Sequence, residues 1–469
     1  MNKRALDKLK YQKDKYSENP QLLFIAMWGI AHIGHFLRKG SVLDIFAWIV
    51  LLLAILVVFK PESSKRMAAL AAVQLFYLFK EMPFTDNHLY IMGFINAGLL
   101  IAIAVSYAKK TSYLHNINLS MGYLCAAFLI AYFAAAFAKL NTGFFDTDYS
   151  CAVTMFYDSA SIITAKNFLP STLESLLPYY VTAAELSIPL LLLFRKTRYL
   201  GILVLVFFHL GISLSPTATA LDFTIALFAL AVPFLDRDAK HEVIRILYSL
   251  GKKTVGFFTA SVYSWPFVIF LFLFLIKSSS RLLSLGIYPY WLLLAPFALL
   301  SGGILLITVF RIGLSWNSSD NSNPFRPLYP IHYLLLLFLI INAATPYLGI
   351  KTIGTFTMYS NLQTENSSSN HFLVDRYFGS MPLDDMVEVI SSDHSVLNSF
   401  AQSGYWITNH ELTRILSESP TSSVQFQRGG ETFDINPAGS STESIRKSFF
   451  KHKLMGHRVY DPENAVCLW

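Results

Sequence analysis

Long apolar runs recur through the first three quarters of the chain and constrain its fold more than any other feature. Residues 124–138 read LCAAFLIAYFAAAFA, with no charged side chain. A helix needs about 17–25 such residues to cross the hydrocarbon core of a bilayer. The whole chain is 54% hydrophobic and 14% charged, with a mean hydropathy of +0.46, whereas soluble domains carry about 25% charged residues. The sequence therefore predicts a polytopic helical membrane protein.

The runs predict an all-α polytopic transmembrane helix bundle of about eleven spans. Lys and Arg in the loops indicate its orientation, because positive charge concentrates on the cytoplasmic side. The loop 277–281, KSSSR, runs against this rule, so one span in the second half could be miscounted. The predicted spans are residues 21–37, 41–60, 67–83, 88–108, 118–138, 177–194, 199–215, 218–235, 257–277, 289–310 and 331–348.

The N-terminal tail, residues 1–20, is strongly basic and is expected to be cytoplasmic. Alternation from this end places the C-terminus outside. The first span lacks a small-residue cleavage site, so it is expected to be an uncleaved signal anchor. The net charge of +7 then belongs mainly to cytoplasmic loops. The lipid bilayer is therefore the expected partner, and nucleic acid is not.

The last quarter of the chain changes character, because its apolar runs shrink and polar residues increase. We expect a small extracytoplasmic α+β domain of about a hundred residues there. The chain then divides into the tail, a transmembrane domain over residues 21–350 and this C-terminal domain over residues 351–469.

Local patterns within the C-terminal domain predict individual elements. The stretches 386–390 and 423–435 alternate between apolar and polar residues, which is typical of strands, and the second contains the turn sequence RGG of a hairpin. Residues 409–419 predict a short helix with Asn409 as its N-cap.

The cysteines provide neither a disulfide framework nor metal-ligand spacing, because the chain has only Cys125, Cys151 and Cys467. Cys151 and Cys467 are both expected outside, where they could be joined or remain free thiols. The sequence also lacks a zinc ligand set, and no metal is expected.

Ionisable side chains at membrane depth are costly and are therefore candidates for function. Lys139 ends the run 124–138 and has two interpretations. It could be an anchor whose ammonium reaches the interface, where the helix dipole also favours a cation. On the predicted topology, however, this end faces outside, where positive anchors are disfavoured. A desolvated amine gives up its proton more readily and could act as a general base.

Glu185 and His209 lie inside other predicted spans. A lone carboxylate there must be protonated or paired, so Glu185 is either a structural bridge to another helix or part of a functional site. Pro189, four residues later, removes a helix hydrogen bond to the Glu185 carbonyl and favours a kink. His209 is either a hydrogen-bonded core residue, the commoner case on an apolar helix, or a functional one.

Other histidines lie near the ends of predicted spans. His32 and His35 share one helix face, which only weakly indicates metal binding without a carboxylate or third histidine nearby. Asp86, Asn87 and His88 lie at the outer end of a span, where Asp86 or Asn87 could be the N-cap. The His88 imidazole is then on the same membrane side as the lysine described above.

Four segments together carry a family pattern. They are DNHLYIMGF (86–94), AKLNTGFF (138–145), the helices over 207–235 and the segment 345–374. In this order and spacing they resemble the vitamin K-dependent gamma-carboxylase-like family, whose membrane region is called the HTTM domain. The resemblance covers most of the chain and points to a bacterial-type member in the inner membrane.

The resemblance implies a mechanism. In this family a lysine deprotonates reduced vitamin K, O₂ turns the quinol into a strong base, and that base prepares a substrate glutamate for addition of CO₂. Lys139 would be the lysine and His88 its helper. The cofactor would be reduced vitamin K or another hydroquinone, with CO₂ and O₂ as co-substrates. The pocket residues would be Asn87, Tyr90, Glu185 and His209.

The substrate stays open, because animal carboxylases carry a much larger lumenal region than this chain does. A peptide or lipid on the extracytoplasmic side would fit. The alternative is a non-catalytic lipid- or quinone-binding membrane protein that recruits a partner through its extracytoplasmic domain. Transport is disfavoured, since the sequence lacks paired discontinuous helices.

Overall fold

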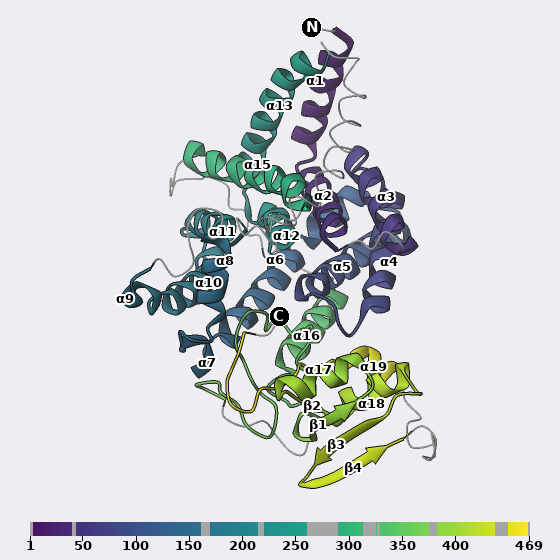
Figure 1. Ribbon diagram of the computed structural model, residues 1–469. Helices are drawn as coiled ribbons and strands as arrows, with labels where there is room; N and C mark the ends of the chain where they lie inside the picture. The colour runs from purple at the N-terminus through teal and green to yellow at the C-terminus, as the bar shows by residue number, and fades with distance from the viewer. Residues whose placement is uncertain are drawn as a thin grey trace.

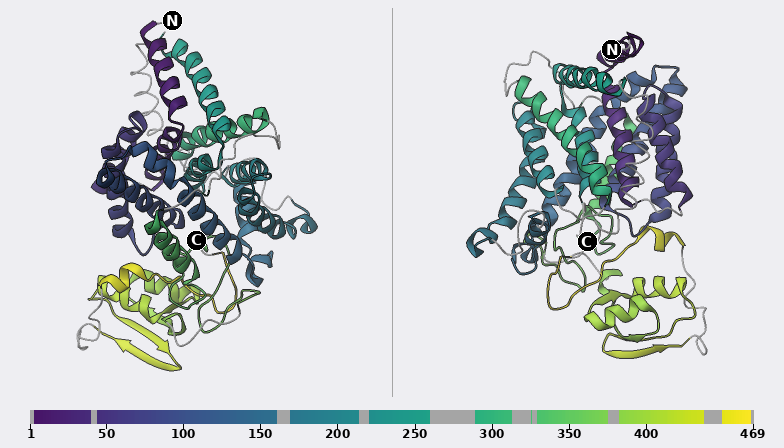
Figure 2. Two further views of the ribbon diagram at one scale, coloured as in Figure 1. Left: turned by 180° about the vertical axis from the view of Figure 1, so that it is seen from behind. Right: turned by 45° about the horizontal axis from the view of Figure 1, so that its top comes forward.

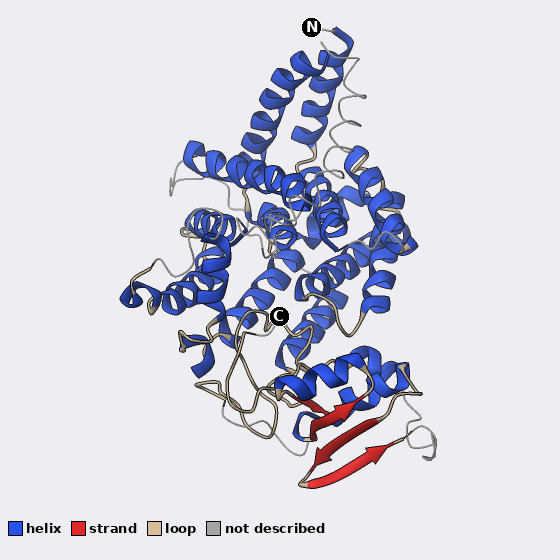
Figure 3. Cartoon of the chain, in the orientation of Figure 1, coloured by secondary structure: helices blue, strands red, loops and turns tan. Residues whose placement is uncertain are grey.

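The computed structural model describes residues 3–39, 44–160, 169–213, 220–259, 289–312, 325, 329–374, 382–436 and 449–467. Most of these residues are helical, and a small antiparallel sheet lies at one end of a helix bundle (Figure 1, Figure 3). The predicted span 257–277 lies almost wholly outside the described residues.

Each of the other predicted spans contains a helix. These helices are α2 (Gln21–Lys39), α3 (Ile45–Phe59), α4 (Ser64–Glu81), α5 (Asn87–Lys109), α6 (Tyr113–Ala138), α10 (Leu177–Leu193), α11 (Arg198–Ser213), α12 (Leu221–Ala231) with the 3₁₀ turn η1 (Val232–Phe234), α15 (Pro289–Ile312) and α16 (Pro330–Ala344). The other described helices of the bundle are α1 (Lys3–Glu18), α7 (Thr142–Phe145), α8 (Cys151–Ala160), α9 (Ser171–Glu174) and α13 (Arg237–Thr259).

Several of these helices could cross a membrane. Among the described residues, 4 segments are long and apolar enough: Asn87–Lys109, Tyr113–Ala138, Ser171–Leu193 and Leu294–Ile312. A fifth is added if the helices Lys10–Glu18 and Gln21–Arg38, which are bent by 108° relative to each other at a short break, count as one span. Other apolar helices, such as α3 and α16, are shorter. The fold is thus that of a multi-pass helical protein with four or five candidate spans, and the total of about eleven stays a prediction.

Close helix packing and buried hydrogen bonds hold the first half of the bundle together. Helix α5 packs between α4 and α6, and a Cβ atom added at Gly98 would lie only 2.1 Å from Cε1 of Tyr123 on α6. Trp28 Nε1 donates to Asn96 Oδ1 at 2.8 Å, and Asn96 Nδ2 donates to Gln74 Oε1 at 2.8 Å. These bonds join α2, α5 and α4 at a depth where water does not compete.

The second half of the bundle packs on the first, and α10 on α6 and α12 on α2 are two of the main contacts. Helix α10 lies between α6 and α11, and α12 packs against α2 and α15. At the far end from the sheet, the basic helix α1 runs beside α13 (Figure 1). The N-terminal helix and the sheet domain therefore lie at opposite ends of the bundle, as both views of Figure 2 show.

The C-terminal domain is a four-stranded antiparallel sheet in the order β2-β1-β3-β4, with helices packed on it. Its elements are η2 (Pro382–Asp384), β1 (Met386–Ser392), α17 (Ser395–Ser403), β2 (Trp406–Thr408), α18 (Asn409–Glu418), β3 (Val424–Arg428), β4 (Glu431–Ile435) and α19 (Phe449–Leu454). The predicted strands and the RGG hairpin are confirmed, since Arg428 pairs with Glu431 across the two glycines.

The predicted cap of α18 is wrong by one residue. Thr408 is the N-cap, and its Oγ1 accepts a hydrogen bond from the Glu411 amide at 3.2 Å. Asn409 is already helical, and its side chain donates to Asp385 Oδ2 at 3.0 Å instead. Thr and Asn both cap helices well. Here the Asn409 side chain is engaged by Asp385, and the adjacent Thr408 caps the helix.

Residues 345–374 form a loop that joins the bundle to the sheet domain. The amides of Thr352 and Ile353 both donate to the Gly456 carbonyl at 3.0 Å, so the C-terminal segment runs beside this loop. The predicted domain boundary at residue 351 falls inside the loop. Gly354 has φ +72°, and a Cβ there would lie 2.1 Å from Cε2 of Tyr90, so the loop also packs directly on α5.

Candidate functional site

A cavity of about 560 Å³ lies between α5, α6, α10, α11 and α12, and the loop 356–359 contributes to its wall. Its lining is mostly apolar. The residues predicted from the sequence that line it are Asn87, His88, Lys139, Glu185 and His209. Sites for small organic molecules are typically apolar cavities of about 300–1,000 Å³ with a few polar groups, and this cavity fits that description.

Lys139 points into the cavity and not toward the surface. It is the residue that follows α6, and it is only 4% exposed. Its Nζ lies 2.8 Å from Glu185 Oε2, 3.5 Å from the Met358 carbonyl oxygen and 5.8 Å from the centre of the Phe144 ring. The interpretation of Lys139 as an interfacial anchor therefore does not describe this structure.

Glu185 brings the partner charge from α10. The ion pair crosses between two helices that pack together, so Glu185 does bridge helices, and it does so at the cavity wall. Pro189 lies inside α10 as expected. The pair therefore places an amine and a carboxylate in direct contact at the cavity wall.

His209 lies on another wall of the same cavity. Its Nε2 is hydrogen-bonded to the hydroxyl of Tyr132 on α6, and both side chains are buried. The two residues are therefore a hydrogen-bonded pair from α11 and α6. Because both also line the cavity, the two interpretations of His209 are compatible here.

His88 belongs to a polar cluster at the start of α5. Its Nε2 lies 3.0 Å from Asp222 Oδ2 and 3.1 Å from His35 Nδ1. Arg38 joins the cluster, with Nε 2.7 Å from Asp222 Oδ1 and Nη2 2.6 Å from Asp86 Oδ2. His88 and Asp222 are almost fully buried, at 2% and 1% exposure. The cluster borders the cavity through His88.

Asn87 and Tyr90 position the loop over α5. Asn87 Oδ1 accepts a hydrogen bond from the Phe356 amide at 2.8 Å, and Phe356 lines the cavity. Asp86 occupies the N-cap position of α5 without a side-chain capping bond, and it pairs with Arg38 instead. Tyr90 packs under Gly354 and is not among the lining residues. The structure thus places Tyr90 behind the cavity wall.

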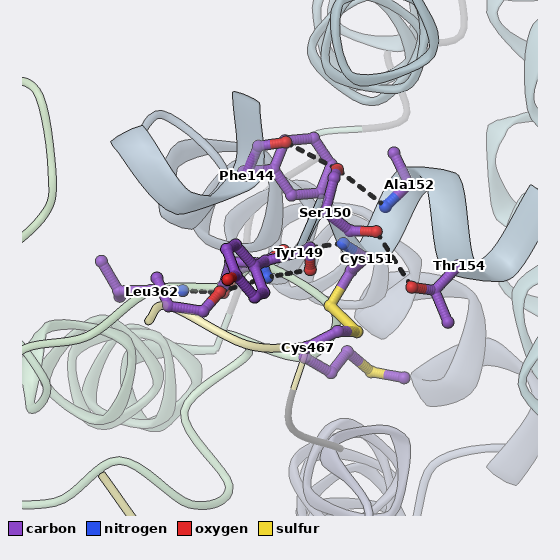
Figure 4. The surroundings of a disulfide bond; sticks show 12 residues. Phe144, Tyr149, Ser150, Cys151, Ala152, Thr154, Leu362 and Cys467 are labelled. Carbon is purple, nitrogen blue, oxygen red and sulfur yellow. Dashed lines mark hydrogen bonds between the residues drawn. A yellow bond between two sulfur atoms is a disulfide. The ribbon is translucent and has the colours of Figure 1, made fainter. Parts of the chain in front are cut away.

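A disulfide lies at the cavity wall, because Cys151 is one of the lining residues. Figure 4 shows its surroundings. Cys151 at the start of α8 is bonded to Cys467 in the C-terminal tail. The Cys151 amide donates to Asn361 Oδ1 at 2.8 Å, and Ser150 Oγ donates to the Phe144 carbonyl at 2.6 Å. The pairing that the sequence left open is therefore formed, and it joins the tail to α8, while Asn361 Nδ2 in the loop donates to the Ala465 carbonyl in the tail at 2.8 Å.

Sequence reasoning missed three members of this region, namely Asp222, Arg38 and Tyr132. Asp222 carried a usable signal, because it lies inside the predicted span 218–235, where an ionisable side chain is costly. Arg38 gave no distinguishing signal, because positive residues commonly flank a span. Tyr132 had no signal at all, since one tyrosine in an apolar helix looks like any other core aromatic.

No family model, no curated protein and no solved structure matches the chain. The resemblance to the carboxylase family therefore depends on the sequence segments quoted above and carries only proposals.

Proposed function

We propose that this chain is a membrane-embedded, quinol-dependent enzyme of the carboxylase or oxygenase type, with Lys139 as its base. One observation carries the proposal. Lys139 and His88, which lie on different helices, both line a single apolar cavity. The sequence pattern assigns the base and its helper to these two residues, and a catalytic pair must reach one bound molecule.

The cavity fits a hydroquinone by its chemistry. The walls are apolar and aromatic, which suits a flat ring and an isoprenoid chain, and the ionisable groups are few. A bound hydroquinone would supply electrons for the reduction of O₂. Lys139 would first pass its own proton to Glu185, and the neutral amine would then take a proton from a ligand hydroxyl. Phe144 would exclude water from the amine. The Tyr132–His209 pair would provide a hydrogen-bonding wall.

The orientation of the site is part of the proposal. A persistent disulfide requires an oxidising compartment, so Cys151–Cys467 supports an extracytoplasmic location for α8 and the C-terminal tail. The basic helix α1 lies at the opposite end of the bundle (Figure 2), as a cytoplasmic N-terminus requires. The substrate, a peptide or a lipid, would then meet the site from outside, with CO₂ as co-substrate in a carboxylase.

The test is quinol-dependent oxygen uptake by the purified protein in lipid nanodiscs. We expect reduced vitamin K or menaquinol to be oxidised by the wild type and not by Lys139→Ala. Lys139→Ala leaves Glu185 without its partner, so the double variant Lys139→Ala, Glu185→Gln serves as the better-folded form of the same test. Full quinol-dependent uptake in both variants would remove Lys139 as the base.

Lys351 provides a matched control. It is a second buried lysine, and burial lowers its pKa to about 8. It lies outside the cavity lining, with Nζ 5.0 Å from the centre of the Tyr90 ring. Lys351→Gln should keep the activity that Lys139→Ala loses, because only Lys139 faces the ligand.

One observation favours the alternative, a quinone- or lipid-binding protein without catalysis. Lys139 is already ion-paired to Glu185, so the pair could serve only to join α6 and α10. This alternative predicts that quinone co-purifies with the protein and that reduced quinone causes no oxygen uptake. Oxygen uptake coupled to quinone oxidation would exclude it.

A further inference from the structure

Three side chains from three helices converge on one point beside the cavity. They are His35 on α2, His88 on α5 and Asp222 on α12. The contacts of their facing atoms form an almost equilateral triangle: His35 Nδ1 lies 3.0 Å from Asp222 Oδ2, His88 Nε2 lies 3.0 Å from the same oxygen, and the two nitrogens are 3.1 Å apart.

A triangle of this size is one face of a coordination octahedron. For metal–ligand bonds of about 2.1 Å, adjacent ligand atoms of an octahedron lie about 3.0 Å apart. We propose that His35, His88 and Asp222 bind one divalent transition-metal ion. Two histidines and one carboxylate on one face suit Fe²⁺, Mn²⁺, Co²⁺ or Zn²⁺ and leave other positions open.

The second oxygen of Asp222 is held in a way that suits a metal ligand. Arg38 Nε lies 2.7 Å from Asp222 Oδ1, so the guanidinium pairs with the carboxylate oxygen that does not contact the histidines. Outer partners of this kind orient a ligating carboxylate. Oδ2 is thereby left to face both imidazoles.

Charge also favours a cation at this point. Arg38 bridges two carboxylates, those of Asp222 and Asp86, so a single guanidinium faces two carboxylate groups. Asp86 Oδ2 lies 3.8 Å from His88 Nε2, and the ligand atoms of His35, Asp86 and His88 all lie within 4.8 Å of one another. Asp86 is thus near enough to stabilise the ion or a water bound to it.

The site is buried but reaches the cavity. The side chain of Asp222 is 0% exposed and that of His35 is 9% exposed, whereas His88 lines the cavity. An ion held by the triad would therefore be bound by one residue of the cavity wall, His88. The inference does not require quinol chemistry, because it stands on the three facing atoms and the charge around them.

The competing explanation is a cluster held only by hydrogen bonds, in which both imidazoles donate to Asp222. The probe that separates the two is Co²⁺, whose visible absorption reports ligand number and type. We expect metal-depleted wild-type protein to bind one Co²⁺ per chain, with weak bands of five- or six-fold coordination. His35→Gln and Asp222→Asn should each weaken this binding by more than about tenfold.

Two control variants remove histidines elsewhere. His332→Asn removes a buried histidine on α16, and His115→Gln removes an exposed one at the start of α6. Both should bind Co²⁺ as the wild type does. Each protein is first checked for a single monodisperse peak in detergent and for its thermal unfolding midpoint. If Asp222→Asn does not fold, His35→Gln alone is used as the test variant.

Folded wild-type protein that takes up no Co²⁺, or stoichiometric uptake that survives both His35→Gln and Asp222→Asn, would overturn the site. Quinol-dependent oxygen uptake by metal-free protein would support the proposed function. It would also show that the metal takes no part in that reaction. Conversely, Co²⁺ binding without quinol oxidation would support the metal site and count against the quinol enzyme.

Discussion

The Lys139 amine at the end of α6 lies 2.8 Å from the Glu185 carboxylate on α10, inside an apolar cavity. A charge pair in such surroundings affects both the activity and the stability of the protein. It supplies the acid–base groups that the cavity offers to a ligand, and it also joins two helices. The consequences for stability and for activity can be separated by experiment.

Breaking the pair on one side should cost more stability than removing it whole. Lys139→Met leaves the Glu185 carboxylate buried without a partner, and such a loss costs about 3–5 kcal/mol. The double variant Lys139→Met, Glu185→Met replaces both groups by apolar ones and should recover most of that loss. Thermal unfolding of the wild type, Lys139→Met, Glu185→Met and the double variant in one detergent measures the coupling. Additive losses in the double variant would show that the two side chains do not interact.

The loop that covers the cavity should depend on the absence of a side chain at Gly354. Its φ is +72°, and an added Cβ would meet the Tyr90 ring at 2.1 Å. Gly404, the residue after α17, has a similar φ of +69° but no atom within 4 Å of an added Cβ. Gly404→Ala therefore measures the backbone cost alone, about 1 kcal/mol.

Gly354→Ala should lower the unfolding midpoint more than Gly404→Ala and should weaken quinone binding, because the clash displaces the loop from α5. Equal effects of the two substitutions on both measurements would show that the contact with Tyr90 does not hold the loop in place.

The sheet domain should lose stability as the pH falls below about 6.5. Burial lowers the pKa of His457 to about 3 and that of His410 to about 4. Both are neutral when folded, whereas the unfolded chain takes up protons below its ordinary pKa of 6.5. Stability from these groups is thus fully present above about pH 6.5 and is lost as the pH falls toward 4. Hydrogen exchange of β1 between pH 7.5 and 5 measures the loss.

The local reason is a specific pair of bonds. Thr408 Oγ1, which caps α18, is bonded to His457 Nδ1 at 2.6 Å, and His457 Nε2 lies 3.0 Å from the Ile350 carbonyl oxygen. A second proton on His457 would occupy the nitrogen that accepts from Thr408. His457→Gln should reduce the pH slope by about one proton. An unchanged slope in His457→Gln would assign the pH dependence to other groups.

The disulfide should hold the C-terminal tail and report on topology. Cys467→Ser should raise hydrogen exchange in the tail from residue 461 onward, because the tail loses its covalent link to α8. In intact cells, a membrane-impermeant reductant followed by an impermeant thiol reagent should label Cys467, which is half-buried, whereas Cys151 is fully buried. Cys125, which is buried and free, is the internal control. Labelling only after cell lysis would place the pair inside and reverse the proposed orientation.

The elements of this protein follow from local sequence. Each predicted span that falls on described residues contains a helix, because the length of an apolar run is a local property. The RGG hairpin was predictable for the same reason, since its two glycines adopt positive φ values that the turn requires. The error at the cap of α18 shows the limit, because Asp385, which lies outside the helix, engages the residue that looked like the cap.

Long-range packing decided which ionisable groups meet. The sequence by itself indicated a polytopic helical chain with ionisable side chains of interest at Lys139, Glu185 and His88. It could not pair His88 with Asp222, because the two lie 134 positions apart and meet only where α5 and α12 approach a common cavity. Hydrophobic length selects helices one at a time, whereas a buried charge is satisfied only by whichever neighbouring helix the packing brings within about 3 Å of it.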